Sequence, residues 1–187
     1  MIKVIENVLP ENEWSELNKD LNSTDFSWFY QKDVIFPTHD YGELNKGLSD
    51  EVFYFAHGYI SLNGNIDNEW QNKHNLPIVK FLTNYFKSDI DLFWSKANMF
   101  TRFKKNYVCG YHTDIENING IDKSFDKAYT FIYYVNTNNG GTQIKDGDFI
   151  PSVKNTGLLM KSDTVHSSVV QTDTNIRLNM NFNFKVV

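Results

Sequence analysis

The chain has 187 residues, a formal net charge of −5, 41% hydrophobic residues and 16% aromatic residues. This composition suits a packed globular protein and argues against a broad nucleic-acid surface, because such surfaces carry an excess of Lys and Arg. No apolar run reaches membrane-spanning length, and the first residues lack the apolar segment of a secretory signal. We therefore expect a cytoplasmic protein with neither membrane nor nucleic-acid partners. The sequence leaves its oligomeric state open.

The cysteine count and the absence of linker-like segments indicate how many domains and what covalent cross-links to expect. The single cysteine, Cys109, excludes an internal disulfide and any metal cluster built from several cysteines. No segment rich in Gly, Ser or charge divides the chain. We expect one domain over residues 1–187, with residues 1–91 as a supporting region and residues 92–187 as the core.

The N-terminal half combines helices with aromatic-rich strands. Residues 2–9 read as a strand, and Pro10 occupies the first position of a helix that presents Trp14, Leu17 and Leu21 on one face. Residues 26–36 and 52–60 read as strands around a turn-prone segment, 37–50. A second helix is expected to follow Pro77, with apolar residues at helical spacing, and His74 before it is expected at the surface or as a cap.

The C-terminal half is a succession of short strands separated by turn clusters. The expected strands are residues 92–103, 128–136, 142–144, 157–161, 165–171 and 176–186. Such spacing is typical of a sandwich or barrel. The fold class is therefore mainly β with α (α+β), a jelly roll buttressed by N-terminal helices.

The last strand alternates strictly between apolar and polar residues. Leu178, Met180, Phe182 and Phe184 share one face, whereas Arg177, Asn179, Asn181 and Asn183 share the other. We expect the apolar face to meet the helices and the polar face, headed by Arg177, to line a cavity.

The residues His112 and Asp114, with His166 further along the chain, are candidate ligands for a single metal ion. In an extended chain, side chains at i and i+2 leave the same face, so His112 and Asp114 can bind one ion, with His166 added from a distant strand. Two histidines and one carboxylate leave coordination positions open and are typical of Fe(II) oxygenases, whereas structural zinc sites close the shell. His39 and His57 offer no comparable partner, and no nucleophile elbow or phosphate loop is present.

Arg177 is the candidate anion anchor of this site. Residues 172–175 read as a hairpin connection, which would pair the strands of His166 and Arg177. A guanidinium fixed below the metal can bind the far carboxylate of a chelating keto acid. Tyr134 could add a hydroxyl group from a neighbouring strand.

The strand order and the polar motifs resemble the Fe(II)/2-oxoglutarate-dependent dioxygenase superfamily, in particular its prolyl-4-hydroxylase-like branch and the small oxygenases of marine bacteriophages. The resemblance covers Ser95 to Lys185. Its motifs are Lys96-Ala97-Asn98-Met99, Tyr111-His112-Thr113-Asp114, Tyr133-Tyr134-Val135-Asn136 with the following turn, Asp163-Thr164-Val165-His166, and Ile176-Arg177-Leu178-Asn179-Met180-Asn181-Phe182.

The resemblance implies a double-stranded β-helix, a cupin-like jelly roll. It implies that His112, Asp114 and His166 bind Fe(II), and that Arg177, assisted by Tyr134, holds 2-oxoglutarate. Asn179 stands where the branch commonly has a small hydroxyl residue, and Arg102 with Phe103 where a Tyr often precedes the H-x-D motif. Arg102 is accordingly the candidate for the metal-proximal carboxylate or the substrate. A phage-encoded protein would act in the host cytoplasm.

The expected reaction uses Fe(II), 2-oxoglutarate and O2 to hydroxylate an unactivated C–H bond and releases succinate and CO2. A peptidyl substrate is favoured, with a nucleobase or small metabolite as the alternative within this chemistry. A metal-free jelly roll used for binding or structure is the alternative outside it. The segment Ile115 to Lys127 follows the candidate ligands and is a candidate lid.

Overall fold

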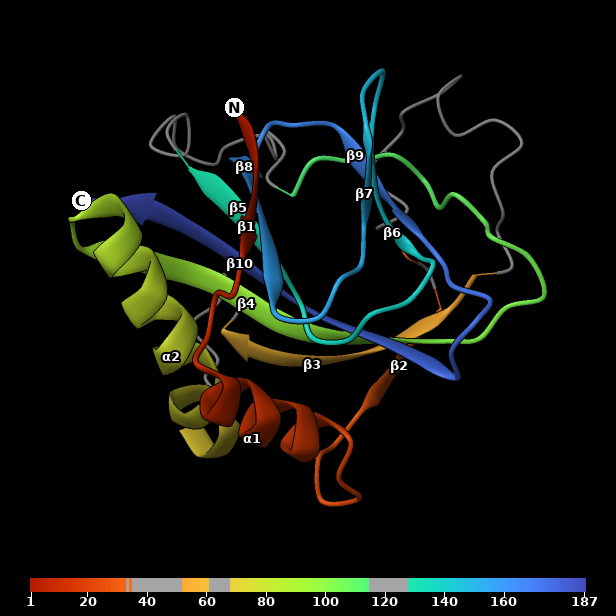
Figure 1. The fold of residues 1–187 in the computed structure, drawn as a ribbon, viewed down its shortest axis with the longest axis horizontal. Coiled ribbons are helices and arrows are strands. Elements are labelled where there is room, and N and C mark those ends of the chain that lie inside the picture. Colours follow the sequence, from red (N-terminus) through yellow and green to blue (C-terminus); the bar gives the residue numbers. More distant parts are fainter. Residues whose placement is uncertain (33, 35–51, 61–67, 115–127) are drawn as a thin grey trace.

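The computed structural model describes residues 1–32, 34, 52–60, 68–114 and 128–187. These ranges contain two helices and two antiparallel sheets (Figure 1). The helices are α1 (Glu11–Leu21) and α2 (Asn68–Phe86). The strands are β1 (Ile2–Glu6), β2 (Phe29–Gln31), β3 (Tyr54–Ile60), β4 (Ile90–Thr101), β5 (Tyr129–Tyr134), β6 (Gly141–Ile144), β7 (Phe149–Pro151), β8 (Thr156–Lys161), β9 (His166–Val169) and β10 (Ile176–Val186).

The two sheets confirm the expected jelly roll. The larger sheet has the strand order β1-β8-β5-β10-β4-β3-β2, and the smaller has the order β7-β6-β9. Strands from both ends of the sequence share the larger sheet, since β1 pairs with β8 and β3 pairs with β4. The expected boundary between residues 91 and 92 falls inside β4, so supporting and core regions meet within a single strand.

Strand β10 separates the apolar core from the polar interior of the jelly roll. Leu178, Met180, Phe182 and Phe184 are buried in the same cluster as residues of α1 and α2, among them Leu17, Leu21, Ile78 and Leu82. The alternation in the sequence predicted this division, because consecutive side chains of a strand leave opposite faces. Both helices lie against one side of the larger sheet, away from β6, β7 and β9 (Figure 1).

Asn155 joins the connection between β1 and α1 to the sheet. The side chain of Asn155 accepts a hydrogen bond from the backbone N of Leu9 at 2.9 Å and donates one to its carbonyl at 2.8 Å. Its Oδ1 also accepts the hydroxyl of Tyr133 at 2.9 Å. In addition, the indole of Trp14 donates to the carbonyl of Val135 at 2.8 Å. These contacts orient α1 over the sheet.

Several expected boundaries were wrong. Pro10 is the N-cap of α1 rather than its first helical residue. Helix α2 begins at Asn68, well before Pro77, which lies inside it. The helix tolerates this proline because the turns on both sides are packed, with His74 1% and Ile78 0% exposed. Strand β7 was not expected at all. Residues 33 and 35–50 lie outside the described ranges, and with them the end of the expected strand 26–36 and the turn 37–50.

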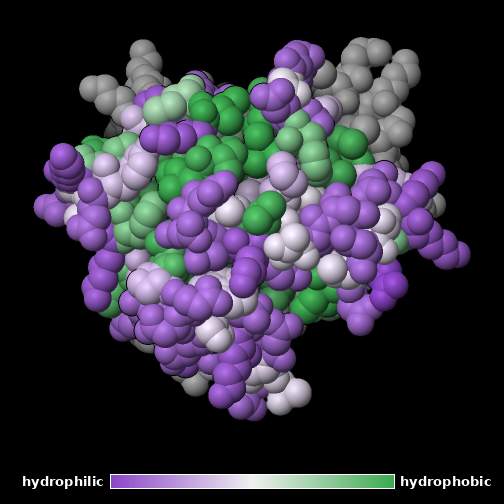
Figure 2. Space-filling view, viewed as in Figure 1, coloured by the Kyte–Doolittle hydropathy of each residue, from purple (hydrophilic) through white to green (hydrophobic). Residues whose placement is uncertain are grey.

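The surface seen in Figure 2 is polar over α1, and apolar residues gather over β1 and its neighbouring strands. Ile2 is 48% and Val4 is 47% exposed there. Within the described ranges, neither helix combines the length and the hydropathy that a bilayer crossing requires.

Candidate metal centre

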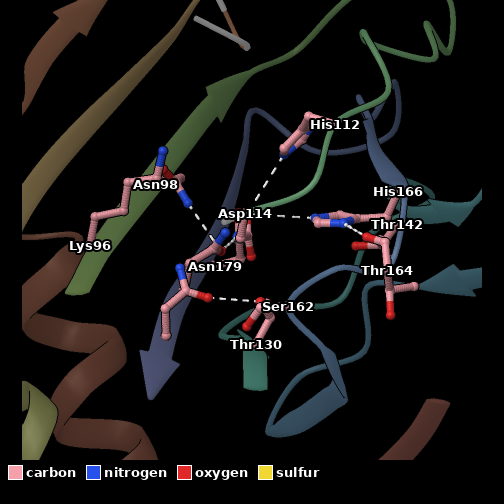
Figure 3. A network of polar contacts seen from close by, with 12 residues as sticks. Lys96, Asn98, His112, Asp114, Thr130, Thr142, Ser162, Thr164, His166 and Asn179 are labelled. Carbon is pink, nitrogen blue, oxygen red and sulfur yellow. Dashed lines mark hydrogen bonds and ion pairs between the residues drawn. The ribbon is translucent and has the colours of Figure 1, made fainter. Parts of the chain in front are cut away.

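His112, Asp114 and His166 converge at one end of the polar interior. Their ligand atoms all lie within 4.8 Å of one another. The Nε2 atoms of His112 and His166 lie 3.7 Å and 3.8 Å from Oδ1 of Asp114. Figure 3 shows both imidazoles directed at this carboxylate, His112 from the connection after β4 and His166 from β9. The structure thus brings together the three residues that the sequence singles out.

The segment that carries His112 is extended beside β9 and antiparallel to it, without forming a regular strand. Only Val108 and His112 form bridge pairs, with Val169 and His166 respectively. Two backbone hydrogen bonds of 2.9 Å join His112 to His166, and the ring centroids of the two lie 4.6 Å apart. The chain bends at Asp114. The two histidines are therefore direct neighbours across the strands, and the bend brings the carboxylate to them.

Hydrogen bonds to the backbone orient both imidazoles. Nδ1 of His112 contacts the carbonyl of Gly110 at 3.2 Å, and Nδ1 of His166 contacts that of Thr164 at 2.9 Å. A carbonyl only accepts, so each Nδ1 carries a proton, and the neutral imidazole of this tautomer presents a lone pair on Nε2 to Asp114. A backbone carbonyl that accepts from the ring nitrogen away from the metal typically fixes the tautomer of a metal-binding histidine.

Electrostatics at the centre favour a cation. Burial, together with neighbouring His166, lowers the pKa of His112 to about 4, so its imidazole is neutral at pH 7. The side chain of Asp114 is only 5% exposed, and its Oδ2 is buried without a hydrogen-bond partner. Two Nε2 atoms and a carboxylate thus face one another, and no donor of the described residues reaches Oδ2 of Asp114. A divalent cation satisfies all three, so the residues present fit a metal with two nitrogen ligands and one oxygen ligand.

A pocket extends from this centre between the two sheets. The larger sheet contributes the inward-facing residues of β4 and β10, and the smaller sheet contributes Thr142 of β6 and Ser168 of β9. Arg177, Asn179 and Asn181 line the pocket, as the alternation of β10 predicted. Asn183, the fourth polar residue of that row, instead accepts a hydrogen bond from Thr130 at 2.7 Å.

Arg177 is a buried positive charge that no carboxylate of the described residues neutralises. It is fully buried, its Nη1 donates to the carbonyl of Val169 at 3.0 Å, and its guanidinium carbon lies 4.8 Å from the ring centroid of Phe100. Its Nε has no partner, and no carboxylate of the described residues pairs with it. Burial lowers the pKa of Arg177 from its ordinary value. A buried cation of this kind is a strong binding site for an anion that enters the pocket.

The expected hairpin between the strands of His166 and Arg177 was wrong. Residues 172–175 connect β9 of the smaller sheet to β10 of the larger, and these strands do not pair. Arg177 instead reaches across the interior to β9, through its hydrogen bond to Val169. The two residues therefore face the same pocket from opposite walls.

The remaining predicted residues differ in how close they come to the pocket. Tyr134 is buried and donates its hydroxyl to Thr142 at 2.7 Å, so it contacts a pocket-lining residue. Asn179 lines the pocket, donates to Asn181 at 2.8 Å and leaves its own Oδ1 without a partner. Arg102 was placed wrongly: β4 ends at Thr101, and the exposed Arg102 side chain hydrogen-bonds Asn175 outside the pocket.

Sequence reasoning gave no role to Lys96 and Asn98, although both lie in a quoted motif. They line the pocket on β4, opposite Asn181 and Asn179 of β10. The signal was present as a second polar alternation in β4, and pairing with β10 places the two rows side by side. Thr142 and Ser168 carried no comparable signal.

Two further titratable residues of the described ranges, Cys109 and His57, lie outside the group of three candidate ligands. Cys109 is 1% exposed, and burial raises the pKa of its thiol to about 12, so it is a packed thiol. His57 is buried, with its Nδ1 2.8 Å from the carbonyl of Ser27. His39 and the candidate lid, Ile115 to Lys127, lie outside the described residues.

Three solved structures similar to this chain are two prolyl hydroxylases and HygX. A prolyl hydroxylase from Trichoplax adhaerens, in complex with a peptide of hypoxia inducible factor, is 11% identical with a TM-score of 0.61, covering 99% of this chain and 83% of that chain. The viral collagen prolyl hydroxylase of Paramecium Bursaria Chlorella virus-1, in its 2OG complex, is 12% identical with a TM-score of 0.54, covering 99% and 96%.

The third is HygX from Streptomyces hygroscopicus with nickel and 2-oxoglutarate bound, which is 11% identical with a TM-score of 0.58, covering 100% of this chain and 83% of that chain. No protein-family model and no curated protein sequence matches the chain. At these identities the likeness shows the fold, which this chain shares with the two prolyl hydroxylases and HygX over 99% or more of its length.

Proposed function

We propose that the protein is an Fe(II)- and 2-oxoglutarate-dependent dioxygenase that hydroxylates a C–H bond of a peptidyl substrate and releases succinate and CO2. The observation that carries this proposal is the pairing of a donor-free His-Asp-His centre with a buried, unpaired guanidinium in one pocket. The cytoplasm is the proposed compartment, because a ferrous site and a lone free thiol suit reducing conditions.

The ligand set supports iron over a structural metal. His112, Asp114 and His166 would hold Fe(II) through two Nε2 atoms and a carboxylate oxygen. Three protein ligands leave positions open for a co-substrate and oxygen. When bound there, Fe(II) with 2-oxoglutarate and O2 supplies the oxidising power for hydroxylation. The chain's own contribution is to fix both imidazoles through Gly110 and Thr164 and to keep Asp114 out of bulk water.

Arg177 supports 2-oxoglutarate as the co-substrate. A dicarboxylate that chelates the metal through one end carries its second carboxylate deeper into the pocket, where the buried guanidinium lacks an anionic partner. Pairing there would neutralise the buried charge through charge-assisted hydrogen bonds. The Thr142 hydroxyl, which accepts a hydrogen bond from Tyr134, can donate its own proton to the same carboxylate.

A peptidyl substrate is favoured by the prolyl-hydroxylase-like motifs and by the two prolyl hydroxylases among the similar structures. A small metabolite is the alternative, and the structure of HygX with hygromycin B bound, at 11% identity and a TM-score of 0.55, is its counterpart. The same assay separates the two, because succinate release rises above its basal rate only with a pool that contains the substrate.

The test combines metal content with co-substrate turnover. Protein loaded anaerobically with Fe(II) should bind one ion per chain, and oxygen with 2-oxoglutarate should then produce succinate, faster with a peptide pool than with metabolite or nucleoside pools. His112→Ala should fold normally and lose this succinate, whereas His57→Gln should keep it. Unchanged succinate release in His112→Ala contradicts the proposal. A protein that retains neither iron nor 2-oxoglutarate would be a metal-free jelly roll.

A further inference from the structure

Among the described residues, two cations line the pocket of the metal centre, and the proposed function uses only Arg177. Lys96 on β4 and Arg177 on β10 both face this space. Arg177 stands opposite Phe100 in the register of the two strands, and Lys96 stands opposite Asn181. The four steps along the strand from Lys96 to Phe100 correspond to about 13 Å of extended chain. The two charges therefore mark separate ends of the pocket.

Lys96 is held in place but not neutralised. Its Nζ donates to the hydroxyl of Tyr54 at 3.1 Å and lies 5.1 Å from the ring centroid of Tyr54 and 5.0 Å from that of Trp94. The two rings attract the ammonium group and restrict its side chain. An ammonium group has three donors, of which one is used here, and no carboxylate of the described residues pairs with it. Two donors and the full positive charge remain available.

With metal and 2-oxoglutarate bound, the pocket would keep one positive charge that no other group of the described residues neutralises. Asp114 is the one carboxylate among the described residues that line the pocket. A divalent metal and Asp114 together carry one positive charge, to which Arg177 and Lys96 each add another. The dianion 2-oxoglutarate neutralises two of these three charges. The remaining positive charge favours an anionic group on the molecule that enters next.

Unsatisfied acceptors lie beside this charge. Asn98 donates to Asn181 at 3.3 Å, while its own Oδ1 is buried without a partner, as is the Oδ1 of Asn179. Figure 3 shows Lys96 and Asn98 extending from the same strand next to the metal centre. Buried acceptors require donors. A ligand with a carboxylate and nearby N–H groups, as a peptide has, complements a cation flanked by amide oxygens.

We propose that Lys96 binds a carboxylate of the primary substrate, and that Asn98 accepts an N–H of the same molecule. The inference rests on the proposed function and adds that the substrate is an anion. The substrate would be a peptide whose carboxylate, from an acidic side chain or from the free C-terminus, lies next to the hydroxylated residue. Lys96 thereby sets substrate specificity, while Arg177 serves the co-substrate.

The test measures binding without turnover, using protein loaded with Zn(II) and 2-oxoglutarate. Two matched pairs of probes are N-acetylproline with N-acetylprolinamide, and N-acetylglutamic acid 1-amide with N-acetylglutamine amide. Saturation-transfer NMR should show at least one carboxylate probe binding about tenfold more tightly than its neutral partner. The pair that responds distinguishes a chain terminus from an acidic side chain. Equal affinities within both pairs, or no binding of either carboxylate, overturns the inference.

Three variants test whether Lys96 causes the preference for the carboxylate probes. Lys96→Gln should abolish the preference for the carboxylate probe, Lys96→Arg should retain it, and Lys104→Gln, a change at an exposed lysine, should not alter it. Circular dichroism checks that each variant is folded. A preference that survives Lys96→Gln, or that is lost in Lys104→Gln, contradicts the inference.

Titration with 2-oxoglutarate separates this inference from the proposed function. Arg177→Gln should weaken 2-oxoglutarate binding to the Zn(II)-loaded protein about 100-fold, as expected for a buried charge pair, and Lys96→Gln less than about threefold. Equal losses in the two variants would make Lys96 a co-substrate residue, which overturns the inference and leaves the proposed function intact. A wild-type protein that binds neither Zn(II) nor 2-oxoglutarate overturns the proposed function itself.

Discussion

Two clusters of histidine and aspartate in the described part of the chain differ in whether their acceptors have hydrogen-bond donors. Between α1 and α2, Nε2 of His74 lies 3.1 Å from Oδ2 of Asp20, and its Nδ1 lies 2.8 Å from the hydroxyl of Tyr59. Lys73 adds an ion pair of 2.7 Å to the same carboxylate oxygen. His74 Nδ1 and Asp20 Oδ2 therefore both have donors, so these two acceptors are satisfied without a ligand.

In the metal centre the same residue types lack donors. The protons of His112 and His166 are on Nδ1 and are bound to backbone carbonyls, so that two lone pairs face the carboxylate of Asp114. A cluster of acceptors alone is unfavourable in a buried site unless a cation occupies it. The comparison shows that proton position, rather than residue identity, separates a structural histidine from a candidate ligand.

Replacing each aspartate by asparagine tests this contrast with the largest expected effect. Asp114→Asn should weaken Zn(II) binding at least about 100-fold, more than the loss of a supporting contact usually costs. Its new N–H group can donate to a histidine Nε2, so the free energy of unfolding of the metal-free protein should rise by about 1 kcal/mol. Calorimetric titration and urea unfolding measure the two quantities.

The matched change Asp20→Asn should act in the opposite sense. Although burial alone raises the pKa of Asp20, hydrogen bonds from Lys73 and His74 outweigh it and lower the pKa, so the charged form stabilises the fold. The variant should lose about 1 kcal/mol of stability and bind Zn(II) normally. Equal changes in Zn(II) affinity for the two variants would remove the distinction between the clusters.

The unpaired guanidinium provides the next prediction. Arg177→Leu should weaken 2-oxoglutarate binding about 100-fold. The same change should leave the protein without ligands as stable as the wild type or up to about 2 kcal/mol more stable, because it removes a buried charge without a carboxylate partner. Thermal unfolding with and without 2-oxoglutarate measures both effects. A large loss of stability without ligand would show that Arg177 serves the fold instead.

A smaller effect on stability is expected at the cluster of His74 and Asp20 between α1 and α2. Tyr59→Phe removes the donor to Nδ1 of His74 and leaves a buried acceptor unsatisfied. The free energy of unfolding should fall by about 1–2 kcal/mol, with Fe(II) and 2-oxoglutarate binding unchanged. Urea unfolding tests the first part, and a variant that loses metal binding would contradict the second.

The pH dependence of stability gives the smallest effect. Burial lowers the pKa of His74 below its ordinary value of 6.5, and its hydrogen bond to Asp20 opposes that shift only in part. The unfolded chain therefore takes up the proton first, so stability present above about pH 6.5 is lost as the pH falls. Metal-free His74→Gln should lose less stability between pH 7.5 and 5.5 than the wild type, by about 1 kcal/mol or less. An identical loss would refute this role of His74.

The strand pattern predicted much of the fold, because burial on one face imposes alternation on the sequence. The two faces of β10 and the three candidate ligands followed from such local signals. Helix α2 was misjudged because Pro77 is a strong start signal, and only tertiary packing shows that the helix continues before it. His74 was expected at the surface because its partners, Tyr59 and Asp20, come from distant elements.

Site residues beyond the ligands required knowledge of which sheet each strand joins. The connection of β9 to β10 reads as a hairpin, yet it crosses between sheets, and that crossing places Arg177 opposite His166 across the pocket. Lys96 and Arg102 lie on one chain segment, but the end of β4 at Thr101 separates the lysine in the pocket from the arginine outside it. Neither point can be derived from residue types alone.

Nitrogen-15 NMR of the imidazole rings, before and after one equivalent of Zn(II), tests the central claim most directly. The metal-free protein should show His112 and His166 protonated on Nδ1, and Zn(II) should shift the Nε2 resonances of both while leaving those of His74 unchanged. Protons on Nε2 of His112 or His166 in the metal-free protein at pH 7, or Nε2 resonances that do not respond to Zn(II), would contradict the account.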